Sequence, residues 1–142
     1  MSEIRSKYYR LSVKALILNE ERNKFLLTKK ENGVWDLPGG GLDWGETPGK
    51  GLAREINEEM QLTARYIAER PSYFFGGYIM SAEPETWFAI VVYETELESL
   101  NFTTSDECTE ITFVSKNDLK DLERVPPTVK DLAEQFKPEN HR

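Results

Sequence analysis

Alternating apolar and polar residues predict extended strands at the start of the chain. Within residues 9–18, aliphatic side chains recur at every second position, as in a strand with one buried face: Val13, Ala15 and Ile17. A polar turn, 19–23, leads into a second run at 24–29. We therefore expect these two runs to pair as a hairpin.

Helical periodicity replaces this alternation between residues 50 and 60. Three apolar side chains mark the buried stripe of an amphipathic helix: Ala53, Ile56 and Met60. Thr47 stands where the helix should begin, and its side chain can accept a hydrogen bond from a free backbone N–H of the first turn. Pro48 suits the first helical position, because the N–H that it lacks would have no partner there.

The remaining pattern predicts more strands and two helices near the C-terminus. We expect strands at 34–37, 63–70, 73–80, 86–96 and 111–114, and helices at 117–122 and 128–136. Residues 101–109 are polar and loop-like, and both ends of the chain, 1–7 and 137–142, are expected to be loose. Strands on both sides of a central helix predict an α/β fold in which a mixed sheet packs between helices.

Length, charge and cysteine content limit the kinds of protein to which this chain can belong. The 142 residues are enough for one domain, 1–142, with a buried core. The net charge of −7 argues against a nucleic-acid polymer as partner, because such a partner needs a basic face. The sequence has no membrane-length apolar run or signal peptide, and its single cysteine excludes an internal disulfide. We expect a cytoplasmic protein without a membrane partner, either monomeric or homodimeric.

Three glutamates share one flank of the predicted central helix. Glu55, Glu58 and Glu59 stand three and four residues apart, which brings neighbouring Cβ atoms to roughly 5–6 Å. Like charges this close repel one another unless a cation binds between them. Mg²⁺ prefers oxygen ligands and commonly takes one or two carboxylates together with phosphate oxygens. The cluster therefore predicts a Mg²⁺ site, which Mn²⁺ can also occupy.

The glycine-rich turn and the acidic helix together resemble the signature of the Nudix hydrolases, the MutT-related family. The residues that carry the resemblance are Gly40, Glu46, Arg54, Glu55, Ile56, Glu58, Glu59 and Leu62. Segments 35–40 and 105–115 are similar to flanking sequences of the same family. The family usually has glycine just before the final aliphatic residue, where this chain has Gln61. We expect Gln61 to end the helix in the left-handed conformation, because the chain must turn at once into the next strand.

The resemblance implies an α/β/α sandwich with a mixed, partly antiparallel sheet. It also implies a Mg²⁺-dependent hydrolase that cleaves a phosphoanhydride bond in a nucleoside diphosphate-linked substrate. A nucleoside triphosphate is the favoured substrate, because the chain has no added domain. ADP-ribose, a nucleotide sugar or a dinucleoside polyphosphate are the alternative substrates. A catalytically silent nucleotide-binding module and an interaction domain without a ligand are the alternatives to an enzyme.

Roles for the helix residues follow from the same resemblance. It implies that Glu55, Glu58 and Glu59 hold the metal, with Glu59 the foremost ligand, and that Glu55 can serve as general base instead. Arg54 lies four residues before Glu58 and can orient that carboxylate. The implied catalytic residues are Arg54, Glu55, Glu58 and Glu107.

Several residues outside the helix complete the implied site. The turn formed by Gly39, Gly40 and Gly41 leaves the backbone free to approach a metal or a phosphate. Glu107 is a further candidate metal ligand, and Glu83 and Glu85 compete for that role. Glu46 can anchor the loop or join the outer shell of the metal. The basic residues that can meet phosphates are Arg10, Lys14, Lys29 and Lys30.

The single histidine and the single cysteine are not expected to act in catalysis. His141 lies in the polar tail. Cys108 has no nearby histidine in the sequence and is expected to be a small packing residue.

Overall fold

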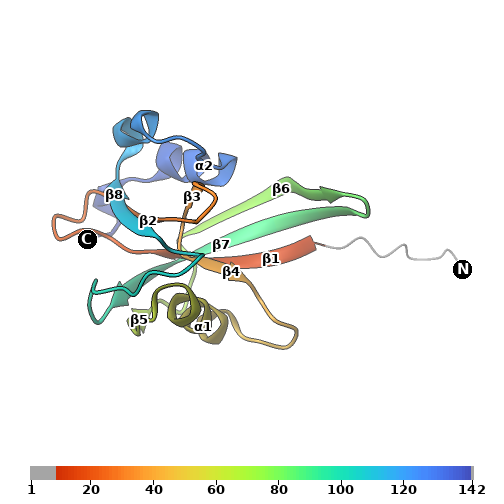
Figure 1. Ribbon diagram of the computed structural model, residues 1–142, viewed down its shortest axis with the longest axis horizontal. Helices are drawn as coiled ribbons and strands as arrows, with labels where there is room; N and C mark the ends of the chain where they lie inside the picture. Colours follow the sequence, from red (N-terminus) through yellow and green to blue (C-terminus); the bar gives the residue numbers. More distant parts are fainter. Residues whose placement is uncertain (1–8, 142) are drawn as a thin grey trace, which may run out of the picture.

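The computed structural model describes residues 9–141, with strands lying between helices (Figure 1). In chain order the elements are β1 (Tyr9–Leu16), β2 (Phe25–Lys29), β3 (Trp35–Asp36), β4 (Gly39–Gly41), α1 (Pro48–Met60), β5 (Ala64–Ile67), β6 (Tyr73–Ala82), β7 (Glu85–Leu97), β8 (Glu110–Val114), η1 (Lys116–Asp121), α2 (Pro127–Gln135) and η2 (Pro138–His141). The two η elements are short 3₁₀ helices, and η1 occupies most of the helix expected at 117–122.

The strands form two sheets. The first has five strands in the order β4-β1-β7-β5, and its fifth strand, β6, also pairs with β7. β1 and β7 run parallel, whereas the other pairs in this sheet are antiparallel. β3, β2 and β8 form a second, antiparallel sheet. The predicted α/β fold with a mixed sheet is confirmed, and its strands are divided between two sheets.

The expected hairpin between 9–18 and 24–29 forms only beside its turn and does not continue along β1 and β2. β1 pairs with β4 and β7, whereas β2 lies in the other sheet between β3 and β8. Beside the turn, Leu18 forms an antiparallel bridge with Phe25, and backbone hydrogen bonds join Leu26 N–H to the Ile17 carbonyl at 2.9 Å and Asn19 N–H to the Lys24 carbonyl at 3.1 Å. β1 is apolar on both faces, with Val13 in one core and Leu16 in the other. Such a strand is most stable inside a sheet with both of its edges paired.

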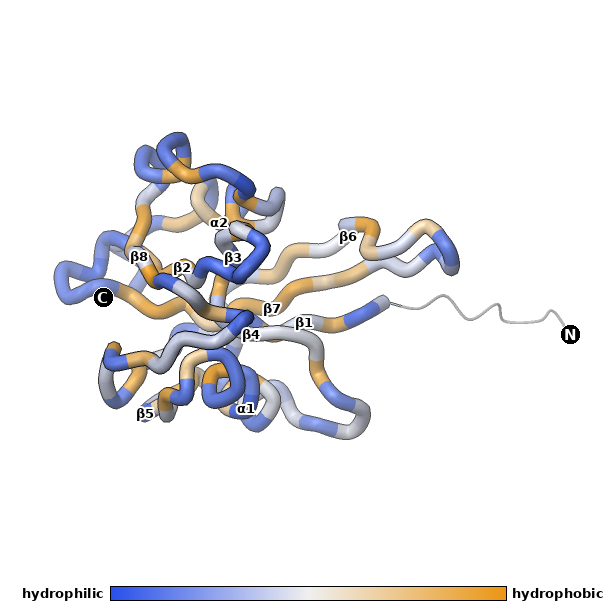
Figure 2. Tube along the Cα trace, in the orientation of Figure 1, coloured by the Kyte–Doolittle hydropathy of each residue, from blue (hydrophilic) through white to orange (hydrophobic). Residues whose placement is uncertain are grey.

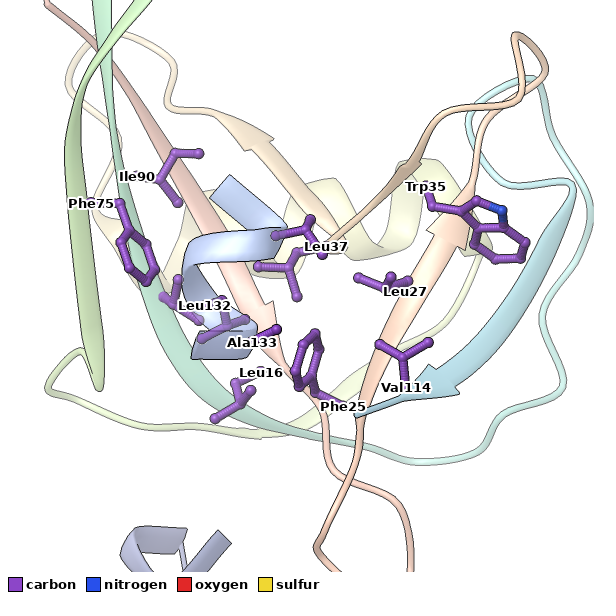
Figure 3. Packing of buried hydrophobic residues seen from close by; sticks show 12 residues of the cluster. Leu16, Phe25, Leu27, Trp35, Leu37, Phe75, Ile90, Val114, Leu132 and Ala133 are labelled. Atoms are coloured by element: carbon purple, nitrogen blue, oxygen red, sulfur yellow. The ribbon is translucent and has the colours of Figure 1, made fainter. Parts of the chain in front are cut away.

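Two hydrophobic cores lie on opposite sides of the five-stranded sheet. One contains side chains from both sheets and from α2, among them Phe25, Leu27, Phe75, Ile90 and Leu132 (Figure 3). The other lies between the sheet and α1, and includes Val13, Ala15, Leu52, Ile56, Met60 and Tyr93. Figure 2 shows the apolar segments concentrated along the central strands. The predicted stripe on α1 is confirmed for Ile56 and Met60, whereas Ala53 is exposed.

The expectation of a loose C-terminal tail is wrong for residues 138–141. His141 is buried; a ring nitrogen lies 2.7 Å from the Tyr73 hydroxyl, and its carbonyl accepts a hydrogen bond from Arg22 Nε at 2.7 Å. Its ring stacks on Phe136. Tyr73 and Arg22 are distant in sequence and Phe136 follows the end of α2, so the polarity of the tail alone did not reveal these contacts. Residues 1–7 and 142 lie outside the described part of the chain.

Helices long and apolar enough to cross a bilayer do not occur among residues 9–141.

Candidate functional site

Glu46 and Arg54 hold the loop that joins β4 to α1. Arg54 donates two hydrogen bonds to the Glu46 carboxylate, at 2.7 Å from Nε and 2.8 Å from Nη2. Glu46 also accepts the backbone N–H of Asp43 at 3.0 Å. The hydrogen bonds from Arg54 lower the pKa of Glu46 to about 2. A bidentate pair of this kind specifies geometry as well as energy, so Glu46 serves as the anchor of the loop.

The expected side-chain cap at the start of α1 is wrong. Thr47 is the residue before the helix, but its side chain makes no capping hydrogen bond. Pro48 is the first helical residue, as predicted, and the backbone carbonyl of Thr47 accepts the N–H of Gly51 at 2.9 Å. The Glu46–Arg54 pair connects the loop before Thr47 to the helix.

Three of the four predicted metal ligands converge on one point. One carboxylate oxygen from each of Glu55, Glu59 and Glu107 lies within 4.8 Å of the others. Glu58 is not part of this group: its side chain is 54% exposed, and it accepts a hydrogen bond from Arg54 at 3.2 Å. The orientation of Glu58 by Arg54 is thus present, but the Glu58 carboxylate lies outside this group of three.

Glu59 is the buried member of this carboxylate group. Glu59 is only 3% exposed, and one of its carboxylate oxygens accepts a hydrogen bond from the backbone N–H of Gly39 at 3.0 Å. Burial raises the pKa of Glu59 to about 8, although the charge of Lys14 and the Gly39 N–H act in the opposite direction. A buried carboxylate beside two others is stabilised in its ionised form by a bound cation. The all-oxygen donor set therefore fits Mg²⁺.

Lys14 lies beneath the glycine turn and not at the surface. It is 6% exposed, and its Nζ lies 3.4 Å from an Asp36 carboxylate oxygen. The same ammonium donates to the carbonyls of Leu37 and Gly39, both at 3.3 Å. Lys14 therefore binds three acceptors within the protein and helps to hold the turn. The structure does not support the expectation that Lys14 meets a phosphate.

The loop that carries Glu107 is attached to the C-terminal end of α1. Ser105 Oγ donates to the carbonyl of Glu59 at 2.7 Å, and Thr103 N–H donates to the carbonyl of Met60 at 3.0 Å. These bonds bring Glu107 to the carboxylates of the helix. Glu83 and Glu85, the competing candidates, lie instead at the turn between β6 and β7, far from α1 (Figure 1).

Gln61 ends α1 in the left-handed conformation, as predicted. Its φ is 55° and its ψ is 37°, and its N–H donates to the carbonyl of Asn57 at 2.8 Å. The helix stops there and the chain enters β5 at Ala64. This sharp turn leaves the carbonyls of Glu59 and Met60 free to accept the Glu107 loop.

Two glycines of β4 leave room for charged side chains. A Cβ at Gly40 would stand 2.7 Å from the carboxyl carbon of Glu55, so this carboxylate lies directly against the backbone. A Cβ at Gly41 would collide with the guanidinium of Arg10, which donates to the carbonyl of Leu42 at 2.8 Å. Arg10 is exposed. An exposed arginine therefore occupies the space of the side chain that Gly41 lacks.

Cys108 is buried, and burial raises the pKa of its thiol to about 11. A thiol of this kind is not ionised at neutral pH, so it is a poor nucleophile. The expectation of a packing residue is confirmed.

The profile of the NUDIX domain family matches residues 8–136 of this chain. The crystal structure of the MutT protein from Methanosarcina mazei Go1 superposes with a TM-score of 0.70 at 30% identity, and the match covers 98% of this chain and 100% of that one. A MutT NUDIX hydrolase from Burkholderia pseudomallei gives a TM-score of 0.73 at 21% identity over 92% of this chain and 100% of that one, and supports the fold alone.

Curated relatives match over shorter segments. An RNA pyrophosphohydrolase from Ruthia magnifica subsp. Calyptogena magnifica is 37% identical over 65 residues, which are 46% of this chain and 36% of that protein. A putative 8-oxo-dGTP diphosphatase from Bacillus subtilis (strain 168) is 36% identical over 72 residues, which are 43% of this chain and 48% of that protein. The chain thus spans about half or less of the length of the curated relatives that it matches.

Proposed function

Because the chain belongs to the Nudix family, we propose that it is a Mg²⁺-dependent pyrophosphohydrolase that cleaves a phosphoanhydride bond in a nucleotide. The observation that carries the proposal is the convergence of Glu55, Glu59 and Glu107 within 4.8 Å. The names of two relatives, RNA pyrophosphohydrolase and 8-oxo-dGTP diphosphatase, support this reaction class. A nucleoside triphosphate is the substrate class that we favour.

We assign the metal to Glu55, Glu59 and Glu107. When bound there, Mg²⁺ supplies charge neutralisation at the phosphates and lowers the pKa of a coordinated water. Glu59 contributes from the interior of the protein, where few waters compete with the cation. Glu55 also remains the candidate general base, since Gly40 leaves its carboxylate against the turn. Glu58 acts through Arg54, with which it pairs at 3.2 Å.

Arg10 is the cation that we assign to the substrate phosphates. Arg54 is engaged by Glu46, Glu55 and Glu58, and Lys14 by Asp36 and two carbonyls. Arg10 has one hydrogen bond to a protein acceptor within the described residues, to the carbonyl of Leu42. Its other donors can bind a phosphate in the bidentate geometry that guanidinium favours.

A turnover screen tests the reaction. The protein is incubated with a nucleoside triphosphate panel, ADP-ribose, a nucleotide sugar and a dinucleoside polyphosphate, with and without Mg²⁺. We expect Mg²⁺-dependent release of a nucleoside monophosphate, fastest from a triphosphate. Faster turnover of ADP-ribose, the nucleotide sugar or the dinucleoside polyphosphate would replace the triphosphate assignment. Tight nucleotide binding without turnover would replace the enzyme with a silent binding module.

Arg10→Gln tests the phosphate assignment within the same assay. We expect this variant to raise KM about tenfold while kcat changes less, because the lost contact binds ground state and transition state alike. Lys130→Gln, on the exposed side of α2, is the matched control and should behave as wild type. An unchanged KM for Arg10→Gln would remove Arg10 from the substrate site.

A further inference from the structure

Part of the five-stranded sheet extends beyond the helix that covers it. Figure 1 shows β6, β7 and the start of β1 projecting past both α1 and α2. α1 covers the sheet as far as Val13, which packs in the same core as Leu52 and Ile56. The three strands continue beyond that point, and within residues 9–141 no helix lies over the face turned toward the side of α1.

Strand register identifies the side chains of this face. Paired residues point to the same side of a sheet, and every second residue along a strand does so too. Val13 pairs with Val91, and Val91 with Phe74, so that this row lies on the side of α1. The next rows on the same side are Leu11–Ala89–Gly76 and Tyr9–Trp87–Ile79.

These rows form an apolar surface, which we call the apolar sheet face: Tyr9, Leu11, Phe74, Ile79 and Trp87. Four of its side chains are strongly exposed, with Tyr9 at 60%, Leu11 at 36%, Phe74 at 65% and Ile79 at 55%. Met80, at the edge of the face, is 56% exposed. Since a fully buried aromatic side chain covers about 150–250 Å², these residues together offer on the order of 500 Å² of apolar surface. The largest apolar patch of a monomeric protein is typically about 300–600 Å², and such a patch is often functional.

The charge pattern narrows the choice of partner. None of the five residues of the apolar sheet face is charged, and β6 contains no charged residue along its whole length. The one charged side chain that is hydrogen-bonded to the five within residues 9–141 is negative, since the Glu85 carboxylate accepts the Trp87 indole N–H at 2.7 Å. A nucleic acid or an acidic membrane surface needs cations that this face lacks, and the net charge of −7 opposes such partners further. An equally apolar, uncharged protein surface is the complement that fits.

We propose that a second copy of this chain packs its own apolar sheet face against this one about a two-fold axis. Two identical apolar faces are self-complementary, as an isologous interface requires. Two such faces together bury on the order of 1,000 Å², which is about the lower limit for a specific interface. β6 has register shifts between Gly76 and Tyr78 and between Ile79 and Ser81. Such bulges twist an edge and hinder extension of the sheet, so the copies meet face to face and not edge to edge.

Sedimentation equilibrium of the full chain over a wide concentration range tests the dimer. We expect the wild type to dimerise and the double variant Phe74→Glu/Ile79→Glu to dissociate, with a dimer Kd raised at least 100-fold. The control Tyr66→Glu/Leu100→Glu changes two residues outside the face that are 51% and 44% exposed, and should remain dimeric. Circular dichroism and thermal unfolding verify that each variant is folded, which is expected because all four positions are exposed.

Three results would overturn the proposal. The first is a wild type that stays monomeric up to high micromolar concentration. The second is a dimer that withstands Phe74→Glu/Ile79→Glu or that the control variant dissolves. The third is binding of a single-stranded RNA oligomer to the monomer that Phe74→Glu/Ile79→Glu abolishes, because the aromatic residues would then be a base-stacking platform.

Discussion

Two groups of carboxylates surround α1, and they differ in how their charge is compensated. Glu46 and Glu58 both accept hydrogen bonds from Arg54, at 2.7 Å and 3.2 Å, and the pKa of Glu46 falls to about 2. Glu59 lies in the other group with Glu55 and Glu107, and burial raises its pKa to about 8. Arg54 also donates to Glu55 at 3.0 Å, so its single charge serves three carboxylates, whereas Glu59 and Glu107 accept no hydrogen bond from it. The second group therefore has less positive charge beside it than the first, which is the condition that a cation-binding site needs.

The largest expected effect comes from removing the charge of the uncompensated group. Glu59→Gln keeps the shape of the side chain, so the fold should persist, but turnover should fall at least about 100-fold because the metal loses its buried ligand. Steady-state rates with saturating Mg²⁺ measure the loss. Glu83→Gln, the same change at the tip of the β6–β7 turn, should retain full activity. A near-wild-type rate for Glu59→Gln would contradict the assignment of the metal to Glu59, and the two carboxylate groups would then not differ in their need for a cation.

The pH dependence of stability should also separate the two groups. Below about pH 4.5 Glu59 is protonated in both the folded and the unfolded state, and its contribution to stability is fully present. Between about pH 4.5 and 8 the unfolded chain releases this proton while the folded protein retains it, so stability is lost as pH rises. With a chelator, the free energy of unfolding should therefore fall by on the order of 1–3 kcal/mol across this range.

Added Mg²⁺ should reverse this loss. A cation that binds only the folded state stabilises by about 2.7 kcal/mol at a hundredfold excess over its Kd. Urea denaturation between pH 5 and 8, with chelator or with Mg²⁺, measures both effects, and Glu59→Gln should respond weakly to pH and to metal. If the stability of the wild type changed with neither pH nor Mg²⁺, the group of Glu55, Glu59 and Glu107 would bind no cation.

Breaking the compensated group should destabilise the fold itself. Arg54→Met keeps the apolar stem but removes the donor that Glu46 and Glu58 share with Glu55, so the free energy of unfolding should fall by more than in the control. The control is Arg65→Met, whose exposed pair with Glu96 should contribute less than about 0.5 kcal/mol. Urea denaturation compares the two variants, and equal losses would mean that the Arg54 network is no stronger than a surface ion pair.

The smallest effect concerns Gln61, which ends the helix that carries both groups. Its left-handed conformation costs a non-glycine residue roughly 1–2 kcal/mol. Gln61→Gly should remove this strain. About 0.4–1 kcal/mol of the resulting stabilisation is cancelled, because glycine gives the unfolded chain more conformational entropy. The net gain should be about 0.5 kcal/mol. Asn57→Gly, inside the helix, should instead destabilise by up to about 1 kcal/mol. A lower denaturation midpoint for Gln61→Gly at unchanged slope would contradict the strain argument.

Local patterns in the sequence were enough to predict α1 and the carboxylates along its flank. Spacings of three and four residues place Glu55, Glu58 and Glu59 on one flank whatever the helix packs against. The end of the helix at Gln61 follows from the chain's need to turn at once into β5. The α/β class follows from strands that alternate with helical segments, which is also a local property.

Only the tertiary structure decided which charges meet. Glu107 joins Glu55 and Glu59 through hydrogen bonds from Ser105 and Thr103 to the end of α1, contacts that span more than forty positions of the chain. β1 takes β4 and β7 as neighbours in place of β2 because both of its faces are buried, and this depends on what lies above and below it. Lys14 and His141 are buried for the same reason: their partners come from distant segments, and a polar residue is stable in the interior only where such partners are present.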